Sequence, residues 1–138
     1  MALATHFLID KSAYARSGNQ FVDLRLRPLL DEEMVASCAI VDLEILFSCR
    51  NFVEYQNTQA ELRSLRDIPI TPEVMSLAMG FQHALAKRGQ HRLPIPDLLI
   101  SAAARTAGLT VLHYNAVFEQ INEVGGAEQE WVVPRGSH

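Results

Sequence analysis

Residues 95–113, which read IPDLLISAAARTAGLTVLH, decide the fold. The pair Pro96–Asp97 is typical of a helix start, and the apolar, alanine-rich run after it predicts a helix over 98–107. Gly108 ends this helix, because glycine readily adopts the left-handed backbone that follows helices. The short apolar run Thr110–His113 then predicts a strand. A helix that leads directly into a strand is the connection from which α/β proteins are built.

The rest of the chain repeats this alternation. Strands are predicted at 7–9, 34–38, 67–70 and 129–133, and helices at 12–17, 21–30, 40–49, 52–65, 72–88 and 116–124. Strands that alternate with helices predict an α/β fold, with three α/β/α layers and a mostly parallel central sheet of four to five strands. In such sheets, functional groups gather outside the carboxyl ends of the strands.

Length and composition limit the class of protein. The 138 residues predict one domain over 1–133, and the tail 134–138 resembles a protease-site remnant of an expression vector, with a native tail as the alternative. A net charge of −4 excludes a strongly basic chain that wraps nucleic acid, and two cysteines exclude a disulfide scaffold. No signal peptide or membrane span is predicted, so we expect a cytoplasmic protein without membrane contact.

Three acidic residues fall at positions that matter in this fold. Asp10 ends the first strand, Asp97 begins a helix, and Glu44 lies along the apolar side of its helix. Each has an ordinary alternative: Asp10 can cap a helix, Asp97 can complement a helix dipole, and Glu44 can pair with an arginine. Ser12 and Asn115 add two oxygen donors beside strand ends. Hard oxygen ligands gathered at one sheet edge are what Mg²⁺ or Mn²⁺ requires.

Four segments together resemble the PIN-domain family, in particular the VapC-type ribonuclease toxins of toxin–antitoxin modules. They are the opening strand and turn at 7–12, the Glu-bearing helix at 40–45, the Asp-led helix at 95–104 and the final segment at 111–121. The resemblance covers about residues 6–133. Their order and spacing are specific, although no single segment is diagnostic.

The resemblance implies a metal-dependent endoribonuclease toxin that cleaves cellular RNA, commonly tRNA or rRNA. It implies neutralisation by a VapB-type antitoxin, and a homodimer that can join a larger toxin–antitoxin assembly. By the same resemblance, Asp10, Glu44 and Asp97 are the catalytic residues and ligands of one or two Mg²⁺ or Mn²⁺ ions. Ser12 and Asn115 assist that site.

The final segment departs from the family pattern. The family usually has Asp where this chain has Asn115, and often a second Asp where it has Val117. Three interpretations stay open: a natural variant with a reduced site, an attenuating substitution, or a catalytically weakened domain that acts mainly as an antitoxin- or RNA-binding module.

Two other folds with acidic sites fit the sequence less well. A response-regulator receiver needs a late lysine, and a haloacid-dehalogenase-type phosphatase needs an acid where Ser12 stands.

Several further residues have predicted roles. Ten arginines against two lysines suit RNA, since arginine binds phosphate through two hydrogen bonds and stacks on bases; the composition of a GC-rich genome is the alternative. Arg16, Arg88 and Arg92 are the predicted RNA contacts. Tyr14 and Phe47 are predicted to be packing residues rather than platforms on which RNA bases stack. The helices at 21–30 and 52–65 carry apolar residues suited to antitoxin binding.

Overall fold

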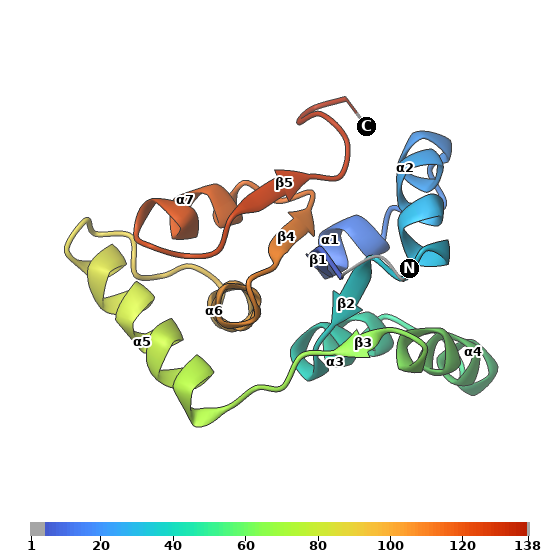
Figure 1. Ribbon diagram of the computed structural model, residues 1–138, viewed down its shortest axis with the longest axis horizontal. Helices are drawn as coiled ribbons and strands as arrows, with labels where there is room; N and C mark the ends of the chain where they lie inside the picture. Colours follow the sequence, from blue (N-terminus) through green and yellow to red (C-terminus); the bar gives the residue numbers. More distant parts are fainter. Residues whose placement is uncertain (1–4, 138) are drawn as a thin grey trace.

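The computed structural model describes residues 5–137, and its centre is one five-stranded sheet (Figure 1). The strand order is β3-β2-β1-β4-β5, and every neighbouring pair is parallel. The strands are β1 (Phe7–Ile9), β2 (Val35–Ser37), β3 (Arg66–Asp67), β4 (Thr110–His113) and β5 (Gln129–Trp131). Residues 1–4 and His138, parts of the predicted domain and tail, lie outside the described residues.

Seven helices in residues 5–137 connect and cover these strands. They are α1 (Lys11–Tyr14), α2 (Gln20–Asp31), α3 (Ala39–Phe47), α4 (Phe52–Arg63), α5 (Pro72–Ala86), α6 (Ile95–Ala107) and α7 (Val117–Glu123). Local sequence explains their ends: the Thr71 side chain accepts a hydrogen bond from Val74 N, and Gly108 ends α6 with a φ of 71°. Helix α6 starts at Ile95, earlier than predicted, so Asp97 lies within its first turn.

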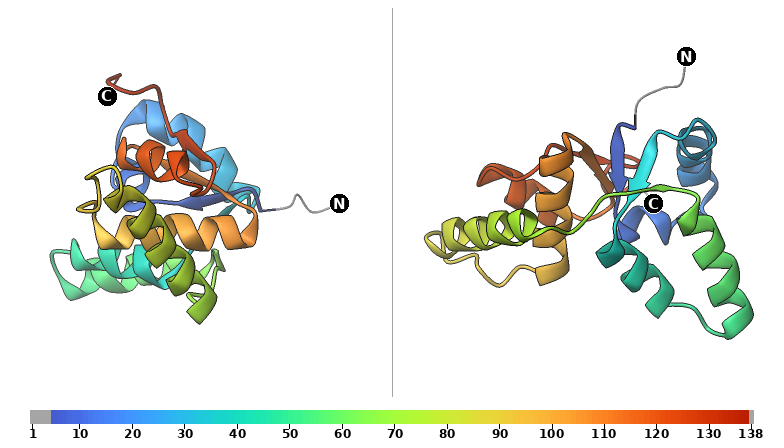
Figure 2. Two further views of the ribbon diagram at one scale, coloured as in Figure 1. Left: turned by 90° about the vertical axis from the view of Figure 1, so that its left-hand side faces the viewer. Right: turned by 60° about the horizontal axis from the view of Figure 1, so that its bottom comes forward.

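The sheet separates two apolar cores. In β1, Leu8 packs into a core shared with α3 to α7, whereas Phe7 and Ile9 pack into a second core with α1 and α2. Alternate residues of a strand point to opposite faces, so a short strand serves both cores. Figure 2 shows α5 and α6 together on one side of the strands and α2 on the other. The predicted α/β/α layers around a parallel sheet are confirmed.

The strand order identifies a switch point at one edge of the sheet. Chain order runs from β1 to β2 and β3 in one direction, and β4 and β5 lie on the other side of β1. The strand order therefore reverses between β1 and β4, and ligand sites in open α/β sheets lie at this switch point. Asp10 directly follows β1, and Tyr114 and Asn115 directly follow β4.

Side-chain exposure corrects one prediction. Tyr14 packs against the interior as expected, but Phe47 at the end of α3 is 90% exposed. The prediction that Phe47 packs inside is wrong, because α3 turns this residue away from the sheet and outward. No helix within residues 5–137 is long and apolar enough to cross a membrane.

Candidate metal centre

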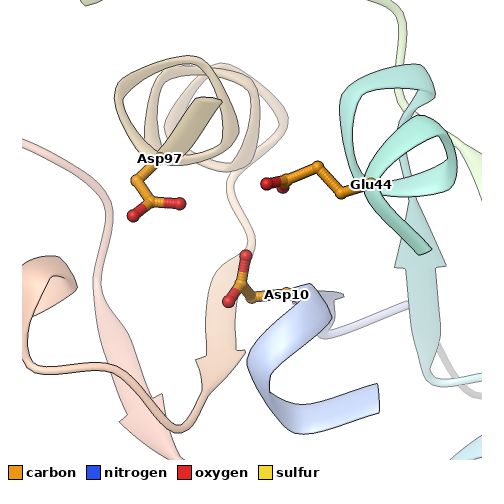
Figure 3. Close-up of side chains that lie close together, drawn as sticks. All are labelled: Asp10, Glu44 and Asp97. Atoms are coloured by element: carbon orange, nitrogen blue, oxygen red, sulfur yellow. The ribbon is translucent and has the colours of Figure 1, made fainter. Parts of the chain in front are cut away.

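Three carboxylates converge at the switch point. Asp10 comes from the end of β1, Glu44 from the middle of α3 and Asp97 from the first turn of α6. One carboxylate oxygen of each lies within 4.8 Å of the others, and Figure 3 shows the side chains pointing toward one another. Asp10 is 3% exposed and Asp97 is 6% exposed. The sequence thus identified three residues, far apart in the chain, that the fold brings together.

Ser12 fixes the orientation of Asp10. Its backbone N and its Oγ donate hydrogen bonds to Asp10 Oδ2 at 3.0 and 2.5 Å. Its Oγ also accepts a hydrogen bond from the backbone N of Tyr114 at 2.8 Å. Ser12 therefore ties the first turn of α1 to the end of β4 and holds the Asp10 carboxylate at the sheet edge, a supporting position for a ligand of a metal site.

The carboxylates repel one another in a partly dry environment. Burial, followed by the charges of Asp10 and Glu44, raises the pKa of Asp97 to about 7. Burial and the charge of Asp10 also raise the pKa of Glu44. Lys11 opposes both shifts, because its positive charge lowers the pKa of each group. Acids with raised pKa values at one site mark a functional candidate.

A divalent cation fits this donor set. Glu44 Oε1 is buried and has no hydrogen-bond partner within residues 5–137, although an unpaired buried carboxylate oxygen is unfavourable. A cation at the centre of the three carboxylates would satisfy that oxygen and remove the mutual repulsion. The donors are all carboxylate oxygens, the ligand type that suits Mg²⁺ and Mn²⁺.

Asn115 makes hydrogen bonds within its own loop. Its Oδ1 accepts a hydrogen bond from Val117 N at 3.1 Å, at the start of α7, and its backbone N donates to His113 Nδ1 at 2.9 Å. The opposite ring nitrogen of the buried His113 lies 2.7 Å from Gln129 Oε1, so His113 is the neutral, Nε2-protonated tautomer. Burial lowers the pKa of His113, which is consistent with this state. These bonds fix the loop and add no negative charge to the site.

The three predicted RNA-contact arginines have different surroundings. Arg16 donates to Ser12 O at 2.9 Å, and its guanidinium lies 4.2 Å from the centroid of the Tyr114 ring. Arg88 instead forms an ion pair with Glu123 of α7 at 3.1 Å. Arg92 is exposed in the loop between α5 and α6. Arg16 is therefore the one that the fold places next to Ser12.

Lys11 is the site residue that sequence reasoning missed. It is the first residue of α1, directly after Asp10, and it influences both Glu44 and Asp97. Its position in the sequence, next to an aspartate that ends a strand, was a signal that could have made it a candidate site residue. Its closeness to Glu44 and Asp97 depends on how α3 and α6 pack over α1, which local sequence does not state.

A family model described as the PIN domain matches residues 16–124. The chain belongs to the PIN-domain family. Ribonuclease VapC51 of Mycobacterium tuberculosis is 38% identical to this PIN-domain protein over 135 residues, covering 98% of each chain. Ribonuclease VapC21 of the same species is 36% identical over 137 residues, covering 98% of this chain and 99% of the relative. The predicted VapC-type PIN domain is confirmed.

Solved structures share the fold at low sequence identity. A chain of VapBC2 from Rickettsia felis, bound to a promoter DNA fragment, matches this PIN domain with a TM-score of 0.71 and 16% identity, over 92% of this chain and 98% of that chain. A chain of VapBC-1 from nontypeable Haemophilus influenzae matches with a TM-score of 0.73 and 13% identity, over 93% and 98% of the two chains. Both matches extend over almost the whole domain.

Proposed function

We propose that this PIN-domain protein is a VapC-type toxin, an endoribonuclease that hydrolyses phosphodiester bonds of cellular RNA with Mg²⁺ or Mn²⁺ as cofactor. The observation that carries the proposal is the convergence of Asp10, Glu44 and Asp97 within 4.8 Å. Full-length relatives named ribonuclease VapC support the activity. We expect the protein to act in the cytoplasm, where tRNA and rRNA are the proposed substrates.

The three carboxylates act as a unit in this proposal. They would hold the cation, which when bound supplies a Lewis acid for the phosphodiester and lowers the pKa of a water molecule. Ser12 keeps the Asp10 carboxylate in a fixed orientation through two hydrogen bonds. Arg16, anchored on Ser12 O and stacked on Tyr114, presents a guanidinium that can bind a neighbouring phosphate. In-line attack by water would leave a 5′-phosphate and a 3′-hydroxyl.

The alternative, a catalytically weakened binding module, has less support. It was motivated by Asn115 and Val117, yet the three carboxylates remain together without a contribution from either residue. Asn115 Oδ1 accepts a hydrogen bond from Val117 N in the turn before α7, a structural role that an asparagine performs fully. We therefore favour an active enzyme whose site relies on three carboxylates.

An RNA cleavage assay tests the proposed activity. Purified protein with Mg²⁺ or Mn²⁺ is expected to cut total RNA, and sequencing of 5′-phosphate ends is expected to locate discrete sites. Asp10→Asn is expected to lower the rate by at least about 100-fold, because an amide binds the cation poorly while keeping the shape of the side chain. Cleavage that persists in EDTA or in Asp10→Asn would contradict the proposal.

The same assay separates the two interpretations of Asn115. Asn115→Asp adds a negative charge to the loop after β4 and keeps an oxygen that can accept the hydrogen bond from Val117 N. If the wild type is active and Asn115→Asp changes the rate by less than about tenfold, the three-carboxylate enzyme is supported. If the wild type is inactive and Asn115→Asp restores cleavage, the chain is a weakened nuclease.

Exposed apolar side chains support the expected protein partners. One group lies on α3 and the start of α4, and a second lies on α5 and the start of α6. The residues of the first group are Leu43, Phe47, Phe52 and Val53, and those of the second are Met75, Met79 and Ile95. Exposed apolar groups on a monomer mark interaction surfaces. We propose a VapB-type antitoxin and a second copy of this chain as the partners.

Sedimentation tests the second copy. We expect a homodimer at tens of micromolar protein, because the apolar group on α5 and α6 would otherwise stay in contact with water. Met79→Lys is expected to shift the protein to a monomer, since a charge in an apolar interface is unfavourable. Lys87→Met, at the C-cap position of α5, is the control. A monomeric wild type at this concentration would contradict the expectation.

A further inference from the structure

Lys11 lies on the border between the metal centre and an open cleft. Its charge influences Glu44 and Asp97 on one side. On the other side it lines a cleft of about 250 Å³ between α1, α3 and α4, together with Ser48, Glu54 and Thr58. A ligand in this cleft can therefore reach the Lys11 ammonium while another part of the same ligand lies at the carboxylates.

Lys11 is not held in an ion pair with any described residue. Within residues 5–137, its ammonium forms no ion pair at 4.0 Å or less. Lysine is a compact cation with three donors, and it binds phosphate as a point charge. The half-buried Lys11 side chain, directly after Asp10 in the chain, thus keeps its ammonium donors available for an incoming anion.

The formal charges at the centre match one divalent cation. Three carboxylates and the Lys11 ammonium together carry a charge of −2, and Asn115 adds none. A single Mg²⁺ or Mn²⁺ neutralises that charge. A second divalent ion would be placed beside the Lys11 ammonium with no further carboxylate in the group to hold it, and repulsion between like charges opposes this.

We propose that this site holds one divalent cation and that the Lys11 ammonium takes the place of a second, contacting a phosphate oxygen of the RNA. This inference rests on the proposed function. In two-metal sites, the second ion stabilises charge that develops on the phosphate. Here a permanent cation of the chain does so, with no proton transferred to or from Lys11. Lys11 is thereby a catalytic residue of the three-carboxylate centre.

Calorimetric titration with Mn²⁺, without RNA, is the first test. We expect one Mn²⁺ per wild-type chain. Lys11→Met removes a positive charge next to the cation and is expected to bind Mn²⁺ about tenfold more tightly. Lys87→Met replaces the only other lysine, is exposed near the end of α5, and is expected to bind Mn²⁺ as the wild type does.

Cleavage at saturating Mn²⁺ is the second test. Lys11→Met is expected to be at least about 100-fold slower than the wild type despite its tighter metal binding, because the phosphate loses its second cation. Lys11→Arg is expected to recover part of the rate. A merely structural role would not move the two measurements in opposite directions, and thermal melting of each variant shows that it is folded.

The outcomes separate the two proposals. Two Mn²⁺ ions per wild-type chain, or unchanged affinity and rate in Lys11→Met, would overturn the role of Lys11 and leave the metal-dependent nuclease standing. A Lys11→Met variant that does not fold is replaced by Lys11→Gln, for which the same results are expected. A wild type that binds no Mn²⁺ and cleaves no RNA would overturn the proposed function as well.

Discussion

Replacing Asp97 by asparagine is expected to abolish RNA cleavage and, at the same time, to make the metal-free protein more stable at pH 8. Asp97 is 6% exposed and faces Asp10 and Glu44, which together with burial raise its pKa to about 7. At pH 8 the Asp97 carboxylate is ionised although it is buried beside two other carboxylates, which destabilises the folded protein. Asparagine has nearly the same shape and no charge, so the repulsion disappears together with the cation ligand.

The two effects have different sizes. We expect a rate at least about 1,000-fold lower, because the three carboxylates act as a unit. A pKa about three units above the ordinary value corresponds to at most about 4 kcal/mol of destabilisation by the ionised group. For a domain of this length, each kcal/mol of stability gained raises the melting temperature by about 3–5 °C.

Thermal melting in EDTA and RNA cleavage in Mn²⁺ measure these effects on the same samples. Asp31→Asn is the matched control, since Asp31 is exposed at the end of α2, away from the three carboxylates. It is expected to change neither quantity. A lower melting temperature for Asp97→Asn would mean that Asp97 supports the fold, and a retained rate would mean that it is not a ligand of the catalytic cation.

Most of the fold could be predicted because its local signals agree. Thr71 before Pro72 predicts the start of α5, Gly108 predicts the end of α6, and alternation of helices and strands predicts the parallel sheet. Element ends were less predictable: α6 begins at Ile95, between its N-cap residue Pro94 and Pro96, rather than after Pro96. Strand β3 is only two exposed residues, so its predicted extent to Ile70 was too long.

The candidate site was predictable where topology decides it. Asp10 and Asp97 stand at chain positions that a parallel sheet brings to one edge, and Glu44 lies on the side of α3 that faces them. Lys11 could not be assigned to the site in this way, since its closeness to Glu44 and Asp97 depends on how α3 and α6 pack. Phe47 was misjudged because helical spacing groups it with apolar residues, whereas its side chain points outward from the end of α3 and is 90% exposed.

The ionisation of Asp97 also predicts how stability depends on pH. In the unfolded chain its pKa is near 3.8, and in the metal-free folded protein it is about 7. Between these values the folded state holds a proton that the unfolded state has lost. The contribution of Asp97 to stability therefore falls by about 1.4 kcal/mol per unit as pH rises from about 4 to about 7, and it is constant outside this window.

His113 changes stability with pH in the direction opposite to Asp97. Burial lowers its pKa below 6.5, so its contribution to stability is lost as pH falls from 6.5 toward its folded-state pKa. In the wild type, the pH-dependent contributions of Asp97 and His113 to stability partly cancel. The difference in unfolding free energy between the wild type and Asp97→Asn removes the His113 contribution, because both proteins contain this residue and its bonds to Asn115 and Gln129.

Urea unfolding of the wild type and Asp97→Asn from pH 4 to pH 8, with EDTA or with Mn²⁺, measures this difference. In EDTA, the asparagine variant is expected to gain up to about 4 kcal/mol over the wild type as pH rises. In Mn²⁺ at 100 times its dissociation constant, the wild type is expected to gain about 2.7 kcal/mol of stability at pH 8 and little at pH 4, because the cation needs ionised carboxylates.

A difference in unfolding free energy between the two proteins that stays constant with pH in EDTA would contradict the repulsion among Asp10, Glu44 and Asp97. A Mn²⁺ gain of the same size in Asp97→Asn would show that the cation binds elsewhere.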